Sequence, residues 1–329
     1  MTKVKQSSNQ RSLADYCQSF SNLNVYKTDK KGYALNQPIL LLSVIDLIAQ
    51  NVIKDEKIYI SDDLIETFKK YWQVIASSPF KGSDFALPFF HLKNVKNNQC
   101  KFWHLQFSSE YEGGRPQTIP RLRHDINYAF LDDELFSLIQ DESTRKELID
   151  ALVSSWLSSD ENEIGEILKI NENFQNESLE QETITESTDT LKIIPKWSLK
   201  KTLIRNAFFR KAVVSVYDCQ CAFCGLKVTK TGNQNIVDGA HIKPFSAFYD
   251  SRIHNGIALC KNHHWAFDRG WFAVDDKYKI IVSKELEEVS PHARTITEFH
   301  GEILILPKVE KYFPDIEALQ WHRDHIFQP

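Results

Sequence analysis

Apolar residues in the first part of the chain recur at helical spacing in two long stretches. Residues 38–51 are apolar almost throughout, which predicts a buried helix with Pro38 at or near its first turn. Residues 61–76 carry apolar side chains every three or four positions, and Ser61 is suited to cap the start of that helix. The first part of the chain therefore begins with two helices that can share a core.

Shorter apolar runs follow these helices. Residues 84–92 and 100–107 have the composition of two short strands, joined by a polar hairpin at residues 93–99. Three more helices are predicted over residues 120–130, 132–140 and 141–157. The first part of the chain is thus expected to be mainly helical with one small sheet.

The apolar pattern stops at residue 160. Residues 160–194 are rich in Glu, Asn, Ser and Thr and predict a solvated, flexible linker, partly helical around residues 163–170. A basic amphipathic helix is then predicted over residues 200–218, followed by short strands and a C-terminal stretch. We expect an α+β chain made of a domain at 1–159, the linker 160–194 and a domain at 195–329.

Length and composition fit this division. At ~150 residues per domain, a chain of 329 residues is expected to form two domains. No apolar run approaches the ~18 residues that a membrane span needs, and the polar start lacks the apolar core of a signal peptide. We therefore expect a cytoplasmic protein without a membrane partner, whose thiols stay reduced.

Charge is unevenly distributed along the chain. Residues 160–190 hold ten acidic residues and one lysine, a net charge of −9, so with −4 overall the rest of the chain sums to +5. A mildly basic body is compatible with nucleic acid as a partner, although +5 over so long a chain is a weak indication.

Cysteines cluster in the last third of the chain. Cys221 and Cys224 are separated by two residues, and so are Cys260 and His263. Each pair can bind one metal ion from a tight turn, and together they predict a structural Zn²⁺ site with three sulfur ligands and one nitrogen ligand. Cys219 lies outside this pattern, either as a buried thiol or as a competitor for the place of Cys221.

Three motifs lie between and around these pairs: "AHIKP" at 240–244, "NGIALC" at 255–260 and "HHWAFDRG" at 263–270. They resemble the HNH endonuclease family. The resemblance extends over residues 200–327 and implies the ββα-metal fold and cleavage of DNA. The family's active-site pattern of His, Asn and His falls on His241, Asn255 and His264.

The resemblance also implies a role for each of these residues. His241 would be the general base, and its ordinary pKa near ~6.5 suits proton transfer at neutral pH. Asn255 cannot titrate and would hold the loop that orients the base. His264 would bind a divalent cation together with Asp268, which lies on the same helical face four residues later. One imidazole and one carboxylate suit Mg²⁺ or Mn²⁺ better than a second zinc.

The chain departs from the family at one place. Many HNH enzymes have a metal-binding Asp or His immediately before the base, where this chain has Ala240. Asp238 lies three residues before His241 and should point to the opposite face of a straight strand. A bulge at Gly239 would turn Asp238 toward the metal. The other interpretation is that Asp238 only pairs with a nearby base and that Asp268 only caps a turn.

Several cations near these motifs are candidates for phosphate contacts, which position DNA without reading its sequence. They are Arg205, Arg210, Lys211, Lys243 and Arg269. For most of them a solvated helix face is an equally good interpretation.

The first domain carries a second set of motifs, which are residues 38–48, "LPFFHL" followed by "FWHL", and residues 132–153. This set resembles the sulfur-binding domain of certain type IV restriction enzymes. In those enzymes the sulfur-binding domain precedes an HNH domain, as here. It would recognise a phosphorothioate, in which a sulfur replaces one non-bridging phosphate oxygen. Because sulfur is larger and more weakly hydrated, a shallow apolar pocket beside phosphate-binding groups can favour it.

Three groups of residues are candidates for this recognition. The pocket would be formed by Pro88, Phe90, His91, Ile119 and Pro120. The DNA backbone would be held by Arg115, Arg121, Arg123 and His124, near a helix start that can face an anion. Asn36 and Gln37 could reach base edges, since amides form paired hydrogen bonds with bases. For His91 a structural role is an equal alternative.

The sequence therefore predicts a modification-dependent restriction endonuclease that acts on double-stranded, phosphorothioate-modified DNA. Cutting both strands needs two active sites or two encounters, so a homodimer or a DNA-bridged pair is expected. One alternative keeps the nuclease but reads a modified base, which needs a deep aromatic cage for a flipped nucleotide. Others are a catalytically silent, zinc-stabilised DNA-binding protein and a first domain that binds protein.

Overall fold

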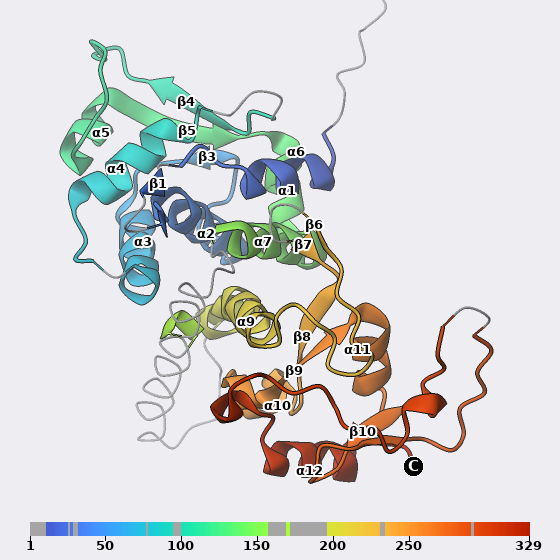
Figure 1. Cartoon of the computed structure of the whole chain (residues 1–329). Helices are drawn as coiled ribbons and strands as arrows, with labels where there is room; N and C mark the ends of the chain where they lie inside the picture. The colour runs from blue at the N-terminus through green and yellow to red at the C-terminus, as the bar shows by residue number, and fades with distance from the viewer. Residues whose placement is uncertain are drawn as a thin grey trace, which may run out of the picture. The chain divides into compact units, whose positions relative to one another are not determined.

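The chain divides into two compact units of mixed helix and sheet (Figure 1). The N-terminal unit comprises residues 1–156 and 192–204, and the C-terminal unit comprises residues 157–191 and 205–329. The mixed composition confirms the α+β class. The computed structural model describes residues 11–25, 27–28, 32–76, 78–94, 100–156, 169–171, 196–230, 234–290 and 293–329.

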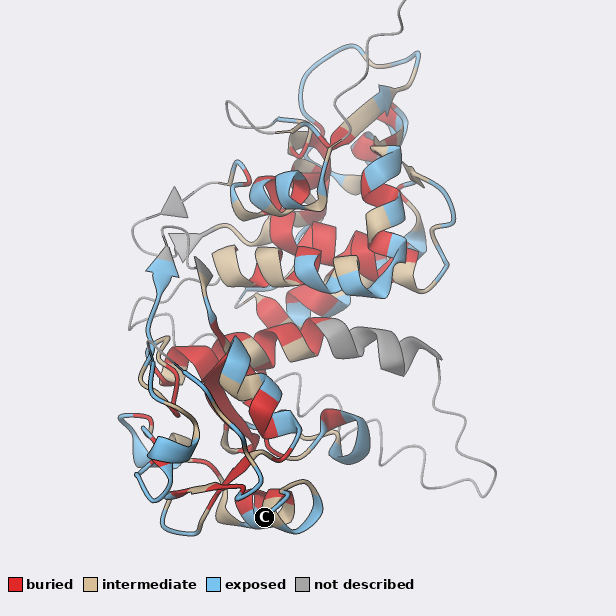
Figure 2. Ribbon diagram, turned by 90° about the vertical axis from the view of Figure 1, so that its right-hand side faces the viewer, coloured by how far each residue is buried: buried red, intermediate tan, exposed pale blue. Residues whose placement is uncertain are grey.

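A buried helix organises the N-terminal unit. Helix α2 (Asn36–Ala49) packs against α3, α4, α6 and α7, and all its residues from Gln37 to Ile48 are buried (Figure 2). The predicted helix is therefore confirmed, as is Ser61, whose hydroxyl accepts a hydrogen bond from the Leu64 amide at the start of α3. The helices of this unit are α1 (Leu13–Ser21), α2, α3 (Asp62–Ile75), α4 (Gly82–His91), α5 (Ile119–Asp125), α6 (Asp133–Gln140) and α7 (Glu142–Trp156).

The sheet of this unit is antiparallel, with β5 (Ile126–Leu131) between β3 (Lys57–Ile58) and β4 (Trp103–Phe107). A separate two-stranded ribbon joins β1 (Lys27–Thr28) and β2 (Gly32–Tyr33). The helix predicted over residues 120–130 is half wrong, because the chain leaves the helix at Asp125 and continues as the central strand. Ala129 and Leu131 alternate into the core at the period of two that marks a strand.

The strand predicted over residues 84–92 is wrong, because these residues form helix α4. Phe85 and Phe89 are buried one helical turn apart, and the Asp84 carboxylate accepts a hydrogen bond from the Lys81 amide at the helix start. The hairpin predicted at residues 93–99 is wrong as well, since the segment joins a helix to a strand; residues 95–99 lie outside the described residues.

Pro88 inside α4 explains the position of Asn36. Proline has no N–H, so the carbonyl of Asp84, four residues earlier, lacks its helical donor. The Asn36 side-chain amide lies 3.2 Å from this carbonyl oxygen and donates a hydrogen bond to it. Asn36, at the start of α2, therefore supplies the hydrogen-bond donor that α4 lacks. This is a structural function within the N-terminal unit.

The C-terminal unit is built around a two-stranded hairpin. Strands β8 (Val237–His241) and β9 (Gly256–Cys260) pair in regular register, with His241 opposite Gly256. Helix α11 (Lys261–Asp268) follows β9 directly, which completes a ββα unit. The other elements are α9 (Lys196–Val216), β6 (Thr229–Lys230), β7 (Gln234–Asn235), α10 (Phe245–Phe248), β10 (Phe272–Val274), β11 (Ile280–Val282), α12 (Ile316–His325) and three short 3₁₀ turns, η1 (Ile253–Asn255), η2 (Thr297–Phe299) and η3 (Glu310–Tyr312). No described helix has the length and apolar character that crossing a membrane requires.

Two glycines let α9 lie directly on the hairpin. A Cβ at Gly239 would meet the Arg210 Cα at 2.9 Å, and one at Gly256 would meet Val213 Cγ2 at 2.4 Å and Phe209 Cζ at 2.9 Å. Residues 239 and 241 share the face that α9 covers, whereas α11 packs on the opposite face with Asp238 and Ala240. The hairpin thus carries His241 on one face and the histidine helix on the other.

Replacing Gly256 by alanine is expected to destabilise the C-terminal unit by about 1–3 kcal/mol, because the added methyl group overpacks the contact with α9. Urea unfolding measures the effect. Gly82→Ala is the matched control, since its Cβ would meet nothing closer than 3.9 Å. Adding Val213→Ala should recover part of the loss. An unchanged midpoint for Gly256→Ala would contradict the close packing of α9.

The C-terminal helix is held by a buried histidine. The His322 ring stacks on Phe267 with centroids 3.8 Å apart, and its Nε2 lies 3.0 Å from the Phe267 carbonyl oxygen. Burial lowers the pKa of His322 to about 4. The neutral ring therefore donates to this carbonyl at neutral pH.

The stability of the C-terminal unit is expected to fall as the pH is lowered from about 6.5 to 4. An unfolded histidine takes up a proton near ~6.5, but the folded His322 does so only near 4, so acid favours the unfolded state, by on the order of 3 kcal/mol across this window. His322→Gln keeps a donor for the Phe267 carbonyl and does not titrate. Urea unfolding of this variant across the same pH range should show a smaller loss, and equal losses would exclude His322 as the cause.

Part of the predicted linker is buried. Of residues 160–194, the structure describes residues 169–171, and Ile170 and Asn171 are 4% and 2% exposed. The Asn171 side chain donates a hydrogen bond to the Ser251 carbonyl oxygen at 2.7 Å. The prediction of a solvated tether is therefore wrong for residues 169–171, which pack on the C-terminal unit. The rest of the predicted linker lies outside the described residues.

Candidate active site and metal centre

The four predicted zinc ligands form one cluster. The ligand atoms of Cys221, Cys224, Cys260 and His263 all lie within 4.8 Å of one another. Cys260 caps the start of α11 and His263 lies in its first turn, with the His263 Nδ1 3.1 Å from the Cys260 sulfur. The first pair lies in a turn closed by the Gly225 amide, which donates to the Cys221 carbonyl. Cys219 is not a member, which settles the choice between Cys219 and Cys221.

The electrostatics of this cluster favour a cation. Hydrogen bonds among the thiols lower the pKa of Cys260 and raise the pKa of Cys221. Burial alone would lower the pKa of His263, but Cys224 and Cys260 raise it to about 9. Negative sulfur thus draws a proton onto the histidine, and a divalent cation would take the place of that proton. Three sulfurs and one nitrogen at this spacing fit tetrahedral Zn²⁺.

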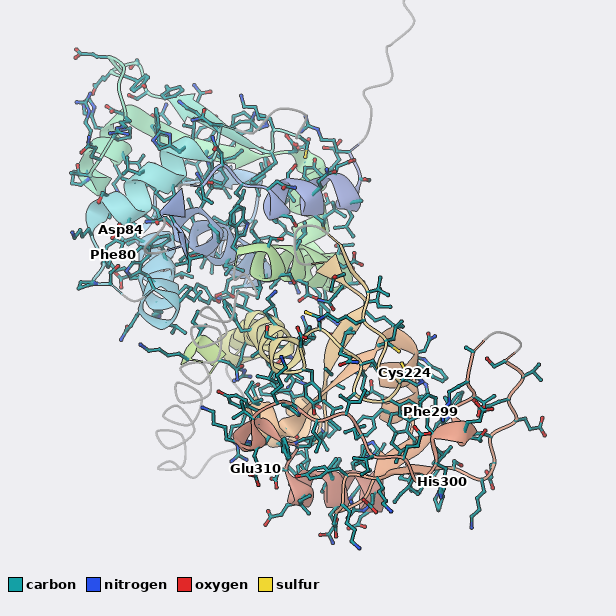
Figure 3. All side chains as sticks on the ribbon, in the orientation of Figure 1. Phe80, Asp84, Cys224, Phe299, His300 and Glu310 are labelled. Carbon is teal, nitrogen blue, oxygen red and sulfur yellow. The ribbon has the colours of Figure 1, made fainter. Side chains whose placement is uncertain are left out.

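Adjacent positions on α11 serve two different sites. His263 faces the sulfur cluster, and its ring stacks on Phe223 with centroids 4.2 Å apart. Phe299, labelled with Cys224 in Figure 3, also packs against Phe223, and its ring centre lies 6.4 Å from that of His263. His264, one residue later and about 100° further round the helix, faces Asp238 instead. The pair of histidines therefore links the sulfur cluster to the carboxylate of Asp238.

His241 is held in its neutral form. Its ring stacks on Phe209 of α9, with centroids 3.7 Å apart and planes 11° from parallel. Burial lowers the pKa of His241 to about 3, and Arg210 and Arg205 contribute to the shift. The expected value near ~6.5 is therefore wrong for this ring. Its Nε2 is buried, and no described residue forms a hydrogen bond with it.

Asn255 joins the two ends of the loop between β8 and β9. Its side-chain oxygen accepts a hydrogen bond from the Lys243 amide at 2.8 Å, and its nitrogen donates to the carbonyls of Lys243 and Asp250. The Ile242 amide also donates to the Asn255 carbonyl at 2.9 Å. This arrangement is the loop-holding one expected for Asn255, and it fixes the chain directly after His241.

His264 lies between two carboxylates. Its Nδ1 lies 3.6 Å from an oxygen of Asp238, and its Nε2 lies 3.5 Å from an oxygen of Asp268. The pairing of β8 and β9 is regular, so the bulge considered at Gly239 is absent. Asp238 reaches His264 without it, because α11 packs on the face of the hairpin that carries Asp238. Asp238 and Asp268 thus lie at different ring nitrogens of His264, and in the described part of the chain these three side chains do not converge on one point as the four ligands of the sulfur cluster do.

The charges around Asp238 keep it ionised. Burial alone would raise the pKa of Asp238, but His264, Lys261 and Arg210 bring it well below its usual range. The Lys261 ammonium lies 2.9 Å from this carboxylate and the Arg210 Nε 3.6 Å. By contrast, burial raises the pKa of Asp268, with opposition from His264 and Arg269. The site therefore offers one firmly negative carboxylate and one that is easier to protonate.

The structure distinguishes among the cations considered for phosphate contacts. Arg205 and Lys211 are 8% and 7% exposed, so a role for them in holding DNA, or on a solvated face, is wrong. Helix α9 is buried on several sides because it packs on the hairpin. Arg210 faces Asp238. Lys243 and Arg269 remain as candidates near the active site.

In the N-terminal unit, most predicted DNA contacts are engaged internally. The Gln37 side chain is buried and donates to the Asn24 carbonyl at 3.3 Å, and Asn36 bonds α4, so neither amide is free for a base edge. Arg121 pairs with Asp125 and Arg123 with Asp62. His124 lies between Asp125 and Glu110.

A smaller group of these candidates remains accessible. His91 ends α4, and burial together with Arg115 and Lys93 lowers its pKa. Arg115 and Pro120 are exposed and Ile119 is half-buried at the start of α5. Pro88 and Phe90 are buried within α4, so they do not form part of this accessible group.

Three contributors were missed by the sequence reasoning. Phe209 covers the base, and Lys261 and Arg210 hold Asp238; Arg210 was considered only for DNA. No motif marks these residues. The spacing of Phe209 and Val213 by one helical turn was a usable signal, because it places both on one face of α9.

Comparison with known proteins agrees with this geometry. Residues 221–275 match the family model described as HNH endonuclease, a match that spans the sulfur cluster, the hairpin and α11. The fold and the site thus define an HNH endonuclease domain. The chain is also similar to a solved structure, the modification-dependent TagI restriction endonuclease, at 22% identity and a TM-score of 0.28 over 37% of this chain and 39% of that one. No curated protein matches the chain.

Proposed function

We propose that this protein is a modification-dependent DNA endonuclease. The observation that carries the proposal is the placement of His241, Asn255 and His264 on one ββα unit beside a four-ligand metal cluster. The family match over residues 221–275 supports the same chemistry. Zn²⁺ in the cluster holds the start of α11, and therefore the position of His264.

Each residue of the site has one task in this reaction. His241, neutral and backed by Phe209, accepts the proton of the water that attacks the phosphorus. Asn255 keeps the loop after His241 fixed. His264 would hold Mg²⁺ or Mn²⁺ with Asp268 at one ring nitrogen or with Asp238 at the other. The bound cation supplies charge neutralisation at the phosphate and at the departing oxygen.

For the N-terminal unit we propose recognition of a phosphorothioate in double-stranded DNA. The supporting feature is the accessible group formed by His91, Arg115, Ile119 and Pro120. It combines an exposed cation with apolar surface, which suits a weakly hydrated sulfur beside normal phosphates. A reader of modified bases needs a deep aromatic cage for a flipped nucleotide, and these four residues do not form one. Recognition of a modified base is therefore the second candidate.

The deciding experiment is a titration of the full chain, carrying His241→Ala to prevent cutting, against two matched duplexes at one stated salt concentration. One duplex carries a single phosphorothioate and the other only normal phosphates. A preference of about tenfold or more, ~1.4 kcal/mol, would support the sulfur reader. His91→Ala and Arg115→Gln should then reduce that preference. Equal affinities would reject it and leave the nuclease assignment to be tested by cleavage.

A further inference from the structure

An arginine stacked on a tryptophan lies beside the expected metal ligands. Asp268 lies four residues after His264 and three after Trp265, so on the surface of α11 it is a neighbour of both side chains. Trp265 is 46% exposed, and the Arg269 guanidinium carbon lies 3.8 Å from the centre of its ring. Trp271 packs edge-on against Trp265 with centroids 4.8 Å apart. The exposed indole is therefore fixed on one side and covered by a cation.

This arginine differs from the other stacked arginines in the C-terminal unit. Arg205 lies 3.9 Å from the Phe245 ring centre but is buried. Arg294 lies 3.9 Å from the Phe299 ring centre, and its charge is balanced by Glu302 at 2.6 Å. No carboxylate in the described part of the chain forms an ion pair with Arg269. It combines stacking and exposure with the absence of a direct ion pair among the described residues.

Stacking leaves the N–H donors at the edge of the Arg269 guanidinium accessible. Arginine has five N–H donors in one plane, and an aromatic ring above that plane takes none of them. The hydrogen bond that the structure gives Arg269 runs from NH1 to the Trp265 carbonyl oxygen at 3.3 Å. The remaining donors can bind a phosphate in the paired geometry that arginine favours. Because the side chain is already held, less conformational entropy is lost on binding.

We propose that Arg269 binds a DNA phosphate next to the scissile one, and that Trp265 is the positioning residue that holds Arg269 for this contact. The proposal rests on the proposed nuclease function and adds to it a backbone contact separate from the metal ligands. Its location follows from the end of α11, where Asp268 is the last helical residue and Arg269 is the C-cap. The contact would fix the strand relative to His264 without reading its sequence.

The test compares Arg269→Gln, Trp265→Ala and Trp265→Phe in the full chain, with Arg294→Gln as the matched stacked-arginine control. Cleavage of a labelled duplex and its binding are both measured over a range of salt concentrations. Arg269→Gln should lower kcat/KM about tenfold, mainly through KM, and reduce the salt slope of binding by about one. Trp265→Ala should give a smaller loss in the same direction, and Trp265→Phe should restore most of it. The double variant Arg269→Gln/Trp265→Ala should be no worse than Arg269→Gln alone.

Several results would overturn the proposal. An unchanged KM and salt slope in Arg269→Gln would exclude the phosphate contact, and so would a loss confined to kcat. Additive losses in the double variant would exclude the positioning role of Trp265. Failure of the unmodified chain and of Arg294→Gln to cut any duplex would instead count against the nuclease function. In that case the binding titration would still decide whether Arg269 contacts DNA.

Discussion

Replacing His241 by alanine is expected to lower kcat for DNA cleavage by about 10²–10⁴-fold, the contribution typical of a positioned general base. Duplex affinity and zinc content should be unchanged, since His241 lies outside the sulfur cluster. His325→Ala is a suitable control, because this exposed histidine stacks only on Trp321 at the end of α12. Retained cleavage in His241→Ala would remove the base from the proposed reaction.

The pH dependence of the unmodified enzyme tests the same residue. Because burial lowers the pKa of His241 to about 3, its ring stays neutral at pH values well below the ~6.5 at which an ordinary histidine titrates. We therefore expect no loss of kcat with a midpoint near ~6.5, the value for an ordinary histidine. A loss of kcat with a midpoint near ~6.5 would contradict this expectation if it persists when each of the other histidines is replaced. It would show that the His241 ring is solvated during the reaction.

Loss of the sulfur cluster is expected to unfold the C-terminal unit. Binding of structural Zn²⁺ to such sites supplies about 10–16 kcal/mol in zinc-finger peptides, more than the stability of most domains. Cys260→Ser should therefore lose zinc and the unfolding transition of residues 205–329, while the N-terminal unit keeps its own transition. Metal analysis and thermal unfolding followed by circular dichroism measure both effects.

Cys219→Ala provides the control for this experiment. Cys219 lies two residues before Cys221, yet it does not belong to the cluster. This variant should bind one zinc per chain and unfold like the unmodified protein. Zinc loss in Cys219→Ala, or a fully folded Cys260→Ser without metal, would contradict the assigned ligand set.

The motif residues of the C-terminal unit could be placed from the sequence because their chemistry depends on short spacings. Two-residue gaps set the sulfur cluster, and the four-residue gap from His264 to Asp268 sets one helical face. The position of Asp238 could not be derived in this way. It depends on which face of the hairpin α11 covers, and this is a tertiary relation between segments.

The N-terminal unit was harder to predict for the same reason. Residues 84–92 form a helix although Pro88 argues against one, and only the distant Asn36 supplies the missing donor. The strand Ile126–Leu131 follows a helix without a Gly or Pro to mark the change. Arginines that looked available for DNA pair with acidic residues of neighbouring elements.

Because His263 and His264 are adjacent, one turn of α11 carries both a ligand of the sulfur cluster and a residue of the proposed active site. If the sulfur cluster holds structural Zn²⁺ as proposed, a molecule without it would have no ordered start to α11 and could not present His264. Partly loaded chains would therefore not be slow enzymes but inactive ones. The specific activity of a preparation should then rise in proportion to its zinc stoichiometry, and zinc content would count the active molecules.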